Sequence, residues 1–385
     1  MNIKSLLLGS AAALVAVSGA RAADAIIAAE PEPVEYVRVC DAFGTGYFYI
    51  PGTETCLRVG GYVRYDIFGG DLFGVESATG DDTYYQNTRF ALKLSTASET
   101  ELGTLRTYVE TRTNYTTGAS NGSTTYYDSD ADALIDVDGG YVNGTTYSLN
   151  FAWIQLGGLR VGKDESFFST WTGYAGAVIN DTPLGGYGPF DTNLISYTYT
   201  GGAFRAGIAL EQGVTDVTYT SGGTVRAGWG IDDYMPHVVV GLGATFGMVD
   251  LSAVAAWDSR DGATTGGWAG KIRADVNIND AFSLFAMLMY GENESGYTTW
   301  GNGGAGFDTF GVSAGGSYAF SDKGAFNFEV DWTESNGAVV DDEWAITANI
   351  AYELVPGLTV TPEIQYVDSV SGDMFGGGVR VQRSF

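Results

Sequence analysis

Residues 268–278 read WAGKIRADVNI, and their alternation decides the fold class. Apolar side chains fall on one face of an extended chain and polar ones on the other, because successive residues of a strand point to opposite faces. The polar face carries Lys271, Arg273 and Asp275 in mid-strand. Such charges do not suit the interior of a soluble β-sandwich. They indicate a water-filled barrel whose apolar face is turned outward.

The same alternation recurs along the chain, for example in residues 104–115, 325–332 and 358–366. We count roughly sixteen such runs from residue 57 to residue 385, or about 20 residues per strand and connector. Short connectors alternate with long ones, and residues 237–257 read as two strands meeting near Gly247. The sequence therefore predicts an all-β fold, a transmembrane antiparallel β-barrel of about 16 strands.

The N-terminus has the pattern of a secretory signal peptide. Lys4 precedes an apolar stretch, and residues 20–22 read ARA, so we predict a signal peptide over residues 1–22. A proline-rich periplasmic leader is expected over residues 23–56, followed by the barrel over residues 57–385. In an exported chain the two cysteines, Cys40 and Cys56, are expected to form one disulfide.

Charge and composition exclude several classes of function. Removing Lys4 and Arg21 with the signal peptide changes the formal net charge from −27 to −29. Such acidity argues against nucleic-acid binding, which needs an excess of basic side chains. Two cysteines and one histidine leave no plausible metal site, and nothing in the sequence calls for a cofactor.

Two candidate motifs are rejected. Residues 128–132 (DSDAD) look like the start of a calcium loop, but Ala133 and Gly139 occupy the positions where an EF-hand needs glycine and glutamate. His237, beside Pro236, reads as an interfacial residue at the start of a strand. A hydrolase that depends on histidine needs that residue beside a nucleophile, so we expect no enzyme.

Residues 164–192, here called the third loop, are too long for a hairpin turn and show no clear periodicity. Their aromatic side chains argue against disorder. We predict that the third loop folds into the barrel lumen and narrows it. Its acidic residues would form one side of the constriction: Asp164, Glu165, Asp181 and Asp191.

Basic residues gather on neighbouring predicted strands, because barrel closure brings the last strand beside the first. The predicted basic wall consists of Arg58, Arg64, Arg89, Lys93, Arg106, Arg112, Arg160, Lys163 and Arg380. A basic wall facing an acidic loop would create a field across the lumen. Such a constriction passes small hydrophilic solutes and ions and selects them by size and charge; the alternative is a substrate-preferring channel of the same fold.

Several long segments carry a family resemblance. They are residues 1–16 (MNIKSLLLGSAAALVA), 34–66, 99–105 (ETELGTL), 154–162 (IQLGGLRVG), 352–357 (YELVPG) and 382–385 (QRSF). The chain resembles the major outer-membrane porins of alphaproteobacteria, most closely the Brucella-type general porins. The resemblance implies a homotrimer of sixteen-stranded barrels in the bacterial outer membrane, each with an inward third loop.

The resemblance and the chain ends also suggest partners. The family's mature start implies a covalent link from Ala23 to peptidoglycan. The terminal Phe385 on an alternating last strand resembles the signal that the barrel assembly machinery recognises. Outer-membrane lipid and lipopolysaccharide would surround the barrel. We interpret the acidic loops as solvated surface loops, and weak bridging to lipopolysaccharide by divalent cations is the alternative.

Overall fold

The computed structural model describes residues 38–76, 82–120, 123–128, 133–138, 140–214, 218–221, 224–227, 229–261, 265–301, 306–335, 341–370 and 372–385. The predicted signal peptide, Ala23, the leader up to residue 37 and the acidic stretch 129–132 lie outside them. None of the described helices has the length and apolar character needed to cross a membrane. The chain divides into the units Met1–Val39 and Cys40–Phe385, and the second contains the barrel.

Sixteen described strands form the barrel wall. In chain order they are β2 (Cys56–Gly70), β4 (Asp82–Thr100), β5 (Gly103–Ser120), β8 (Tyr141–Leu156), β9 (Leu159–Glu165), β10 (Asp191–Gly201), β11 (Phe204–Glu211), β14 (His237–Phe246), β15 (Val249–Trp257), β16 (Trp268–Asn279), β17 (Phe282–Glu292), β18 (Asp308–Ser321), β19 (Gly324–Thr333), β20 (Glu343–Val355), β21 (Leu358–Ser369) and β22 (Gly372–Ser384).

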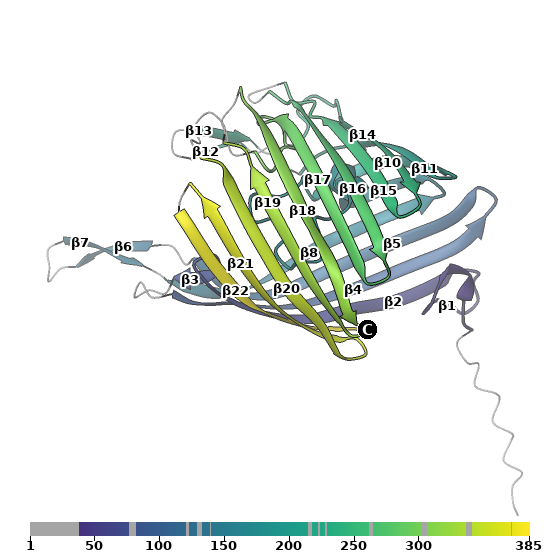
Figure 1. Ribbon diagram of the computed structural model, residues 1–385, viewed down its shortest axis with the longest axis horizontal. Coiled ribbons are helices and arrows are strands. Elements are labelled where there is room, and N and C mark those ends of the chain that lie inside the picture. Colours follow the sequence, from purple (N-terminus) through teal and green to yellow (C-terminus); the bar gives the residue numbers. More distant parts are fainter. Residues whose placement is uncertain are drawn as a thin grey trace, which may run out of the picture. The chain divides into compact units, whose positions relative to one another are not determined.

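Each barrel strand pairs antiparallel with the next one, and β22 closes the sheet onto β2. The closing register runs from Tyr62 opposite Ser384 to Gly70 opposite Gly376. Phe385 extends the seam, since its N–H and C=O both bond to the backbone of Gly61 at 3.0 Å. Figure 1 shows strands β16 to β20 running side by side in this order. The predicted closed antiparallel barrel of sixteen strands is confirmed.

Short turns and long connections alternate around the barrel, as the sequence predicts. β14 and β15 meet at Gly247, whose φ of 60° favours glycine because it has no Cβ. Some long connections contain strands of their own: β3 (Gly74–Glu76), the hairpin β6 (Ser123–Asp128) with β7 (Ala133–Asp138), and the hairpin β12 (Thr218–Ser221) with β13 (Thr224–Ala227). The short-turn and long-loop pattern is typical of outer-membrane barrels.

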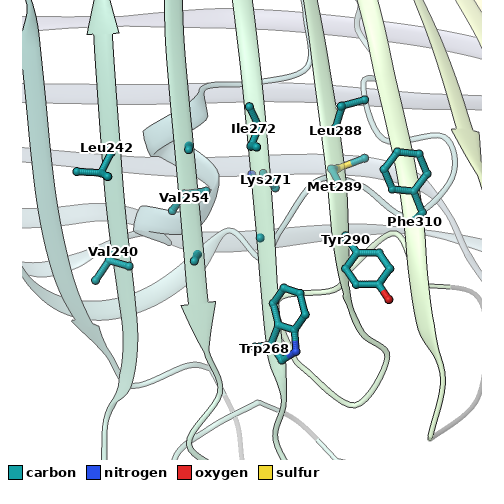
Figure 2. A pocket seen from close by; sticks show the side chains of 13 residues that line it. Val240, Leu242, Val254, Trp268, Lys271, Ile272, Leu288, Met289, Tyr290 and Phe310 are labelled. Atoms are coloured by element: carbon teal, nitrogen blue, oxygen red, sulfur yellow. The ribbon is translucent and has the colours of Figure 1, made fainter.

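The barrel is apolar outside and polar inside. In β16, Trp268 and Ile272 are 44% and 60% exposed, whereas Lys271 and Arg273 are only 2% and 8% exposed. Figure 2 views the outer side of β14–β18, where Leu242, Ile272 and Leu288 project from different strands around a hollow of about 460 Å³. An outward apolar face with inward charges is the arrangement that a lipid-embedded barrel needs.

The segment before β2 folds against its first residues. It contains a 3-10 helix, η1 (Asp41–Phe43), and the short strand β1 (Phe48–Tyr49), which pairs with β2. The predicted disulfide between Cys40 and Cys56 is confirmed, with Cα atoms 6.1 Å apart. Both cysteines are buried with Ala97 of β4. Residues 40–55 of the predicted leader therefore pack with the barrel, in the unit Cys40–Phe385.

Candidate functional site

The third loop leaves the wall at the end of β9 and returns as β10. Its first turn is the helix α2 (Phe167–Thr172), where the Ser166 hydroxyl accepts a hydrogen bond from the Phe168 N–H and so caps the helix. The two ends of the loop meet where Ser166 N–H donates to the Phe190 carbonyl at 2.7 Å. This bond closes the base of the loop, and residues 167–189 extend from that base away from β9 and β10.

The helix α2 packs on the inner side of the wall through aromatic rings that lie over glycine. A Cβ on Gly241 would stand 2.5 Å from the Trp171 ring, and one on Gly207 would stand 2.5 Å from the Phe167 ring. The Trp171 indole N–H also donates to the Leu242 carbonyl at 3.0 Å. Glycine at these two positions lets α2 lie flat against β11 and β14.

Two charged side chains hold the third loop near its two ends. The buried carboxylate of Glu211 accepts hydrogen bonds from the Ser166 hydroxyl at 2.8 Å, the Phe167 N–H at 2.6 Å and the Tyr297 hydroxyl at 2.9 Å. The buried Lys271 ammonium donates to a carbonyl of the loop, that of Tyr187, at 2.5 Å. Both groups belong to the polar, inward phase of their strands.

The middle of the loop is anchored on β20 and β21. The Glu363 carboxylate accepts the backbone N–H groups of Ile179 and Asn180, the second at 3.0 Å. Asn349 donates both to Glu363 and to the Ala177 carbonyl, each at 3.0 Å. Glu363 and Asn349 lie 183 and 172 residues after the loop residues Asn180 and Ala177 in the sequence. Their strands, β21 and β20, lie beyond β14 to β16 when the barrel strands are followed from β9, and β14 to β16 are the strands that α2 contacts most. The third loop therefore runs inside the barrel, as predicted, along the inner side of β14 to β21.

The basic residues of the predicted wall occupy β2, β4, β5, β9 and β22, which are neighbours of one another apart from β8 between β5 and β9. Directly opposed residues of antiparallel strands share a face. Arg64 lies opposite both Arg89 and Gln382, and Arg160 lies opposite Gln155. By this register, eight of the nine basic residues face the lumen: Arg58, Arg64, Arg89, Lys93, Arg106, Arg112, Arg160 and Arg380.

Lys163 is the exception. Lys163 lies three residues after Arg160 on β9, and residues an odd number of positions apart on a strand point to opposite faces. Its side chain therefore shares the outward face with the exposed Ile195 and Tyr197. Lys163 pairs there with Asp191. The structure thus separates both residues from the predicted constriction.

Four of the eight inward residues of the predicted basic wall have a carboxylate partner. Lys93 and Arg112 share Glu110, Arg160 pairs with Asp164 at 2.8 Å, and Arg380 pairs with Asp66 at 2.7 Å. Within the described part of the chain, the remaining four have no carboxylate within 4 Å: Arg58, Arg64, Arg89 and Arg106. Arg64 and Arg89 instead donate to the amide oxygens of Gln382 and Asn114. This wall therefore keeps positive charge that no neighbouring carboxylate neutralises.

The predicted acidic residues of the loop do not act as one group. Asp164 pairs within the basic wall, and Glu165 accepts the Tyr174 hydroxyl at 2.5 Å near the base of the loop. Asp181 lies in the middle of the loop and accepts the Tyr187 hydroxyl at 2.8 Å. Burial raises the pKa of Asp181 above its usual value, while the Tyr187 bond and the charge of Arg380 act in the opposite direction. Asp181 lines a hollow together with Met289 of β17 and Asp331 of β19, on the side of the barrel that the loop covers.

The carboxylates that hold the loop, Glu211 and Glu363, are not among the site residues predicted from the sequence. Glu363 lies on the polar face of the run 358–366, and its 3% exposure shows that it lies beneath other groups. Glu211 is 1% exposed at the end of β11. For Glu363, the available signal in the sequence was a carboxylate in mid-strand with no basic residue directly opposite it on either neighbouring strand. Its partner, a loop about 180 residues away, is a contact that strand periodicity does not encode.

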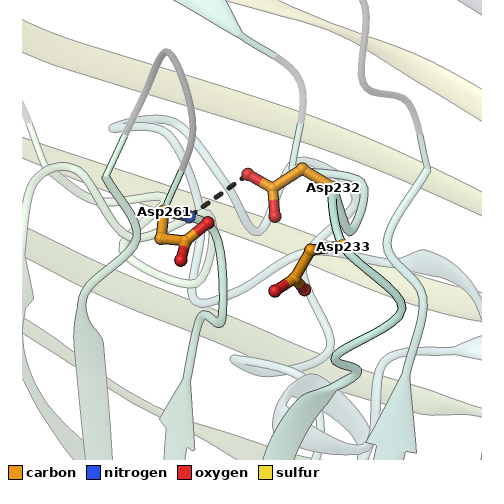
Figure 3. A group of neighbouring side chains, drawn as sticks. All are labelled: Asp232, Asp233 and Asp261. Carbon is orange, nitrogen blue, oxygen red and sulfur yellow. Dashed lines mark hydrogen bonds between the residues drawn. The ribbon is translucent and has the colours of Figure 1, made fainter.

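The histidine and one cluster of carboxylates remain as candidates for catalysis or metal binding. His237 is fully buried rather than interfacial as predicted; its Nδ1 accepts the Ser259 N–H, and its Nε2 lies 2.5 Å from the Trp229 carbonyl. Among the described residues, only the exposed carboxylates of Asp232, Asp233 and Asp261 come close enough together to hold a metal ion (Figure 3). Exposed acidic groups commonly gather without an ion, so they indicate no metal site.

Comparisons with known proteins agree with this architecture. Residues 24–379 match the family model described as Porin subfamily. The chain is 50% identical to Porin Omp2b of Brucella suis biovar 1 (strain 1330) over 402 residues, covering 100% of both chains. In fold alone it is similar to the outer membrane channel DcaP of Acinetobacter baumannii (TM-score 0.63, 14% identity, 88% of this chain and 99% of that chain). It is also similar to a triple mutant of Rhodopseudomonas blastica porin (TM-score 0.51, 17% identity, 86% and 100%). The chain therefore belongs to the porin family of the bacterial outer membrane, whose barrels are channels for passive diffusion.

Proposed function

We propose that this porin selects small hydrophilic solutes and ions by size and charge where the third loop narrows the lumen. One observation carries the proposal: the two sides of the lumen differ. The loop covers β14 to β21 from within, and the open side carries arginines that no carboxylate neutralises. Charges facing a narrow aqueous gap act strongly, because little water is present to screen them.

Size selection follows from the anchors of the loop. Glu211, Lys271 and Glu363 hold it at three separated points on the wall. A loop fixed in this way narrows the lumen by a constant amount. Catalysis plays no part in the proposal, since the one histidine is buried with both ring nitrogens engaged.

The assembly and the partners also belong to the proposal. A homotrimer is supported by the full-length similarity to other porins. Phe385 lies at the closing seam, and the barrel assembly machinery would bind it before the barrel closes. We also expect contacts with lipopolysaccharide through the acidic loops and a covalent link from Ala23 to peptidoglycan. Both expectations rest on the sequence alone. Finding no peptide that begins at Ala23 on purified sacculi would remove the last of these.

Charge selection is tested by reversing one lumen charge. Lys93 is a suitable target, because it lies inward and its side chain is 40% exposed. Replacing Lys93 with glutamate should shift the reversal potential in a salt gradient toward cation preference. Lys323→Glu is the matched control, since it makes the same charge change at an exposed turn between β18 and β19. Equal shifts in the two variants would show that the channel does not sense the basic wall.

A further inference from the structure

A cavity of about 310 Å³ lies inside the barrel between the helix α2 and the inner side of β8, β9 and β10. It is separate from the contacts that hold the middle of the loop. Polar residues form one part of its lining: Gln155, Arg160, Asp164, Thr170, Ser196 and Thr198. Aromatic and aliphatic side chains of Phe167, Trp171 and Leu194 form the other part.

The polar part of the cavity holds its charges in a fixed arrangement. The Arg160 guanidinium donates to the Gln155 amide oxygen at 2.8 and 3.0 Å and to the Asp164 carboxylate at 2.8 Å. By contrast, the hydroxyls of Ser196 and Thr198 make no hydrogen bond with the described part of the chain. The cavity thus offers an ordered donor and acceptor pair on one strand and two available hydroxyls on the next.

The apolar part is equally well fixed. The rings of Phe167 and Trp171 stack with centroids 4.9 Å apart. Their helix is held by Glu211 at its start and by the Trp171 bond to Leu242 at its end. A ligand would therefore meet preformed aromatic surface and would not have to order it.

The lining discriminates between classes of solute. An anion is disfavoured because Asp164 already neutralises Arg160 and Glu165 adds a negative charge. An apolar solute would cover the two free hydroxyls without bonding to them, which costs free energy. A neutral polyhydroxy ring fits both parts, because its C–H face packs on aromatic rings and its hydroxyls both donate and accept. The cavity is larger than a single pyranose ring.

We propose that this cavity is a subsite that binds one sugar ring during passage through the channel. The inference rests on the proposed diffusion function and adds a substrate class to it. The sugar would lie beside the third loop, with ring hydroxyls on Asp164, Ser196 and Thr198.

The test measures glucose-dependent current noise and block in single channels of the full-length protein. Wild type should show a saturable effect of glucose, whereas polyethylene glycol of matched size should not. Replacing both Ser196 with alanine and Thr198 with valine removes two hydroxyls with little change in volume. We expect glucose affinity to fall roughly three- to tenfold for each hydroxyl lost.

A second variant and a control keep the test decisive. Trp171→Ala removes aromatic surface and should also weaken glucose binding; the hydroxyl variant decides the matter if this change disturbs the loop. Ser252→Ala removes a lumen-facing hydroxyl of β15 outside the cavity and should leave the glucose effect unchanged.

The outcomes separate the inference from the function on which it rests. A conducting wild-type channel that shows no saturable glucose effect overturns the sugar subsite and leaves the diffusion function intact. A glucose effect that survives in the double hydroxyl variant places binding elsewhere and also overturns the subsite. Absence of conductance in folded protein would contradict the diffusion function itself.

Discussion

Glu363 is the most informative residue to remove, because its carboxylate accepts two backbone N–H groups of the third loop where the loop meets β20 and β21. Replacing it with alanine deletes the acceptor of three hydrogen bonds, from Ile179 N–H, Asn180 N–H and the Asn349 amide. Hydrogen bonds to a charged group contribute about 1.5–3 kcal/mol each. The gross loss is therefore roughly 4.5–9 kcal/mol.

The net effect is smaller, because the released amides can bond to water in the lumen. We expect the held position of residues 177–181 to be weakened by about 2–4 kcal/mol, which is roughly a 30- to 1,000-fold change in its local equilibrium. Glu211 still holds the loop before this segment, at Phe167, and Lys271 still holds it after this segment, at Tyr187. The loop should stay inside the barrel while its middle becomes mobile.

Single-channel recording and liposome swelling provide the assay. Glu363→Ala should show higher open-channel noise and a larger mean conductance than wild type, and it should admit larger sugars into liposomes. Glu363→Gln keeps one acceptor oxygen and should lie between the two. Glu99→Ala, which removes an exposed carboxylate at the β4–β5 turn, is the control. Wild-type conductance, noise and size limit in Glu363→Ala would refute the assigned tether.

Three further predictions concern the wall and the disulfide. Ile272→Arg should destabilise the barrel by about 2–4 kcal/mol, whereas Ile278→Arg near the strand end should cost about 0–1 kcal/mol; equal heat resistance of the two variants would mean that the outward face is misassigned. Gly241→Ala should force Trp171 to move and cost about 1–3 kcal/mol, whereas Gly270→Ala, whose nearest neighbour would be 3.6 Å away, should be tolerated in the same heat-resistance assay; equal losses would contradict the packing of α2. Replacing Cys40 and Cys56 with serine should lower the stability of the segment before β2 by about 3 kcal/mol, seen as faster proteolysis of that segment with intact conductance; unchanged proteolysis would show that the disulfide is dispensable there.

The fold was predictable from the sequence because apolar and polar residues alternate along each barrel strand and so show which face points to lipid and which to the lumen. The run 268–278 alternates between lipid and lumen at every residue, so one wrong face would place Lys271 and Arg273 in lipid. Gly247 likewise marked the turn between β14 and β15. These features are local, and local periodicity is what a sequence displays directly.

The candidate site was predictable only where it lies on long, clean strands. Arg64, Arg89 and Arg380 were placed on neighbouring strands, because closure of the barrel follows from its strand order. Lys163 was grouped with Arg160, yet it falls on the other face of the short strand β9.

The anchors of the loop were not predictable from local sequence. Asn180 and Glu363 meet across a separation of 183 residues, and their contact depends on the path of an irregular segment. The same limit applies to the aromatic packing of α2, because the glycines beneath Trp171 and Phe167 belong to β14 and β11.

The most direct test of the central claim is single-channel conductance of the purified full-length protein in a planar bilayer under a salt gradient. The account predicts stepwise openings in groups of three, steady conductance and a modest ion selectivity. Complete absence of conductance from folded, heat-modifiable protein would contradict it, because the third loop would then plug the lumen that it is proposed to narrow.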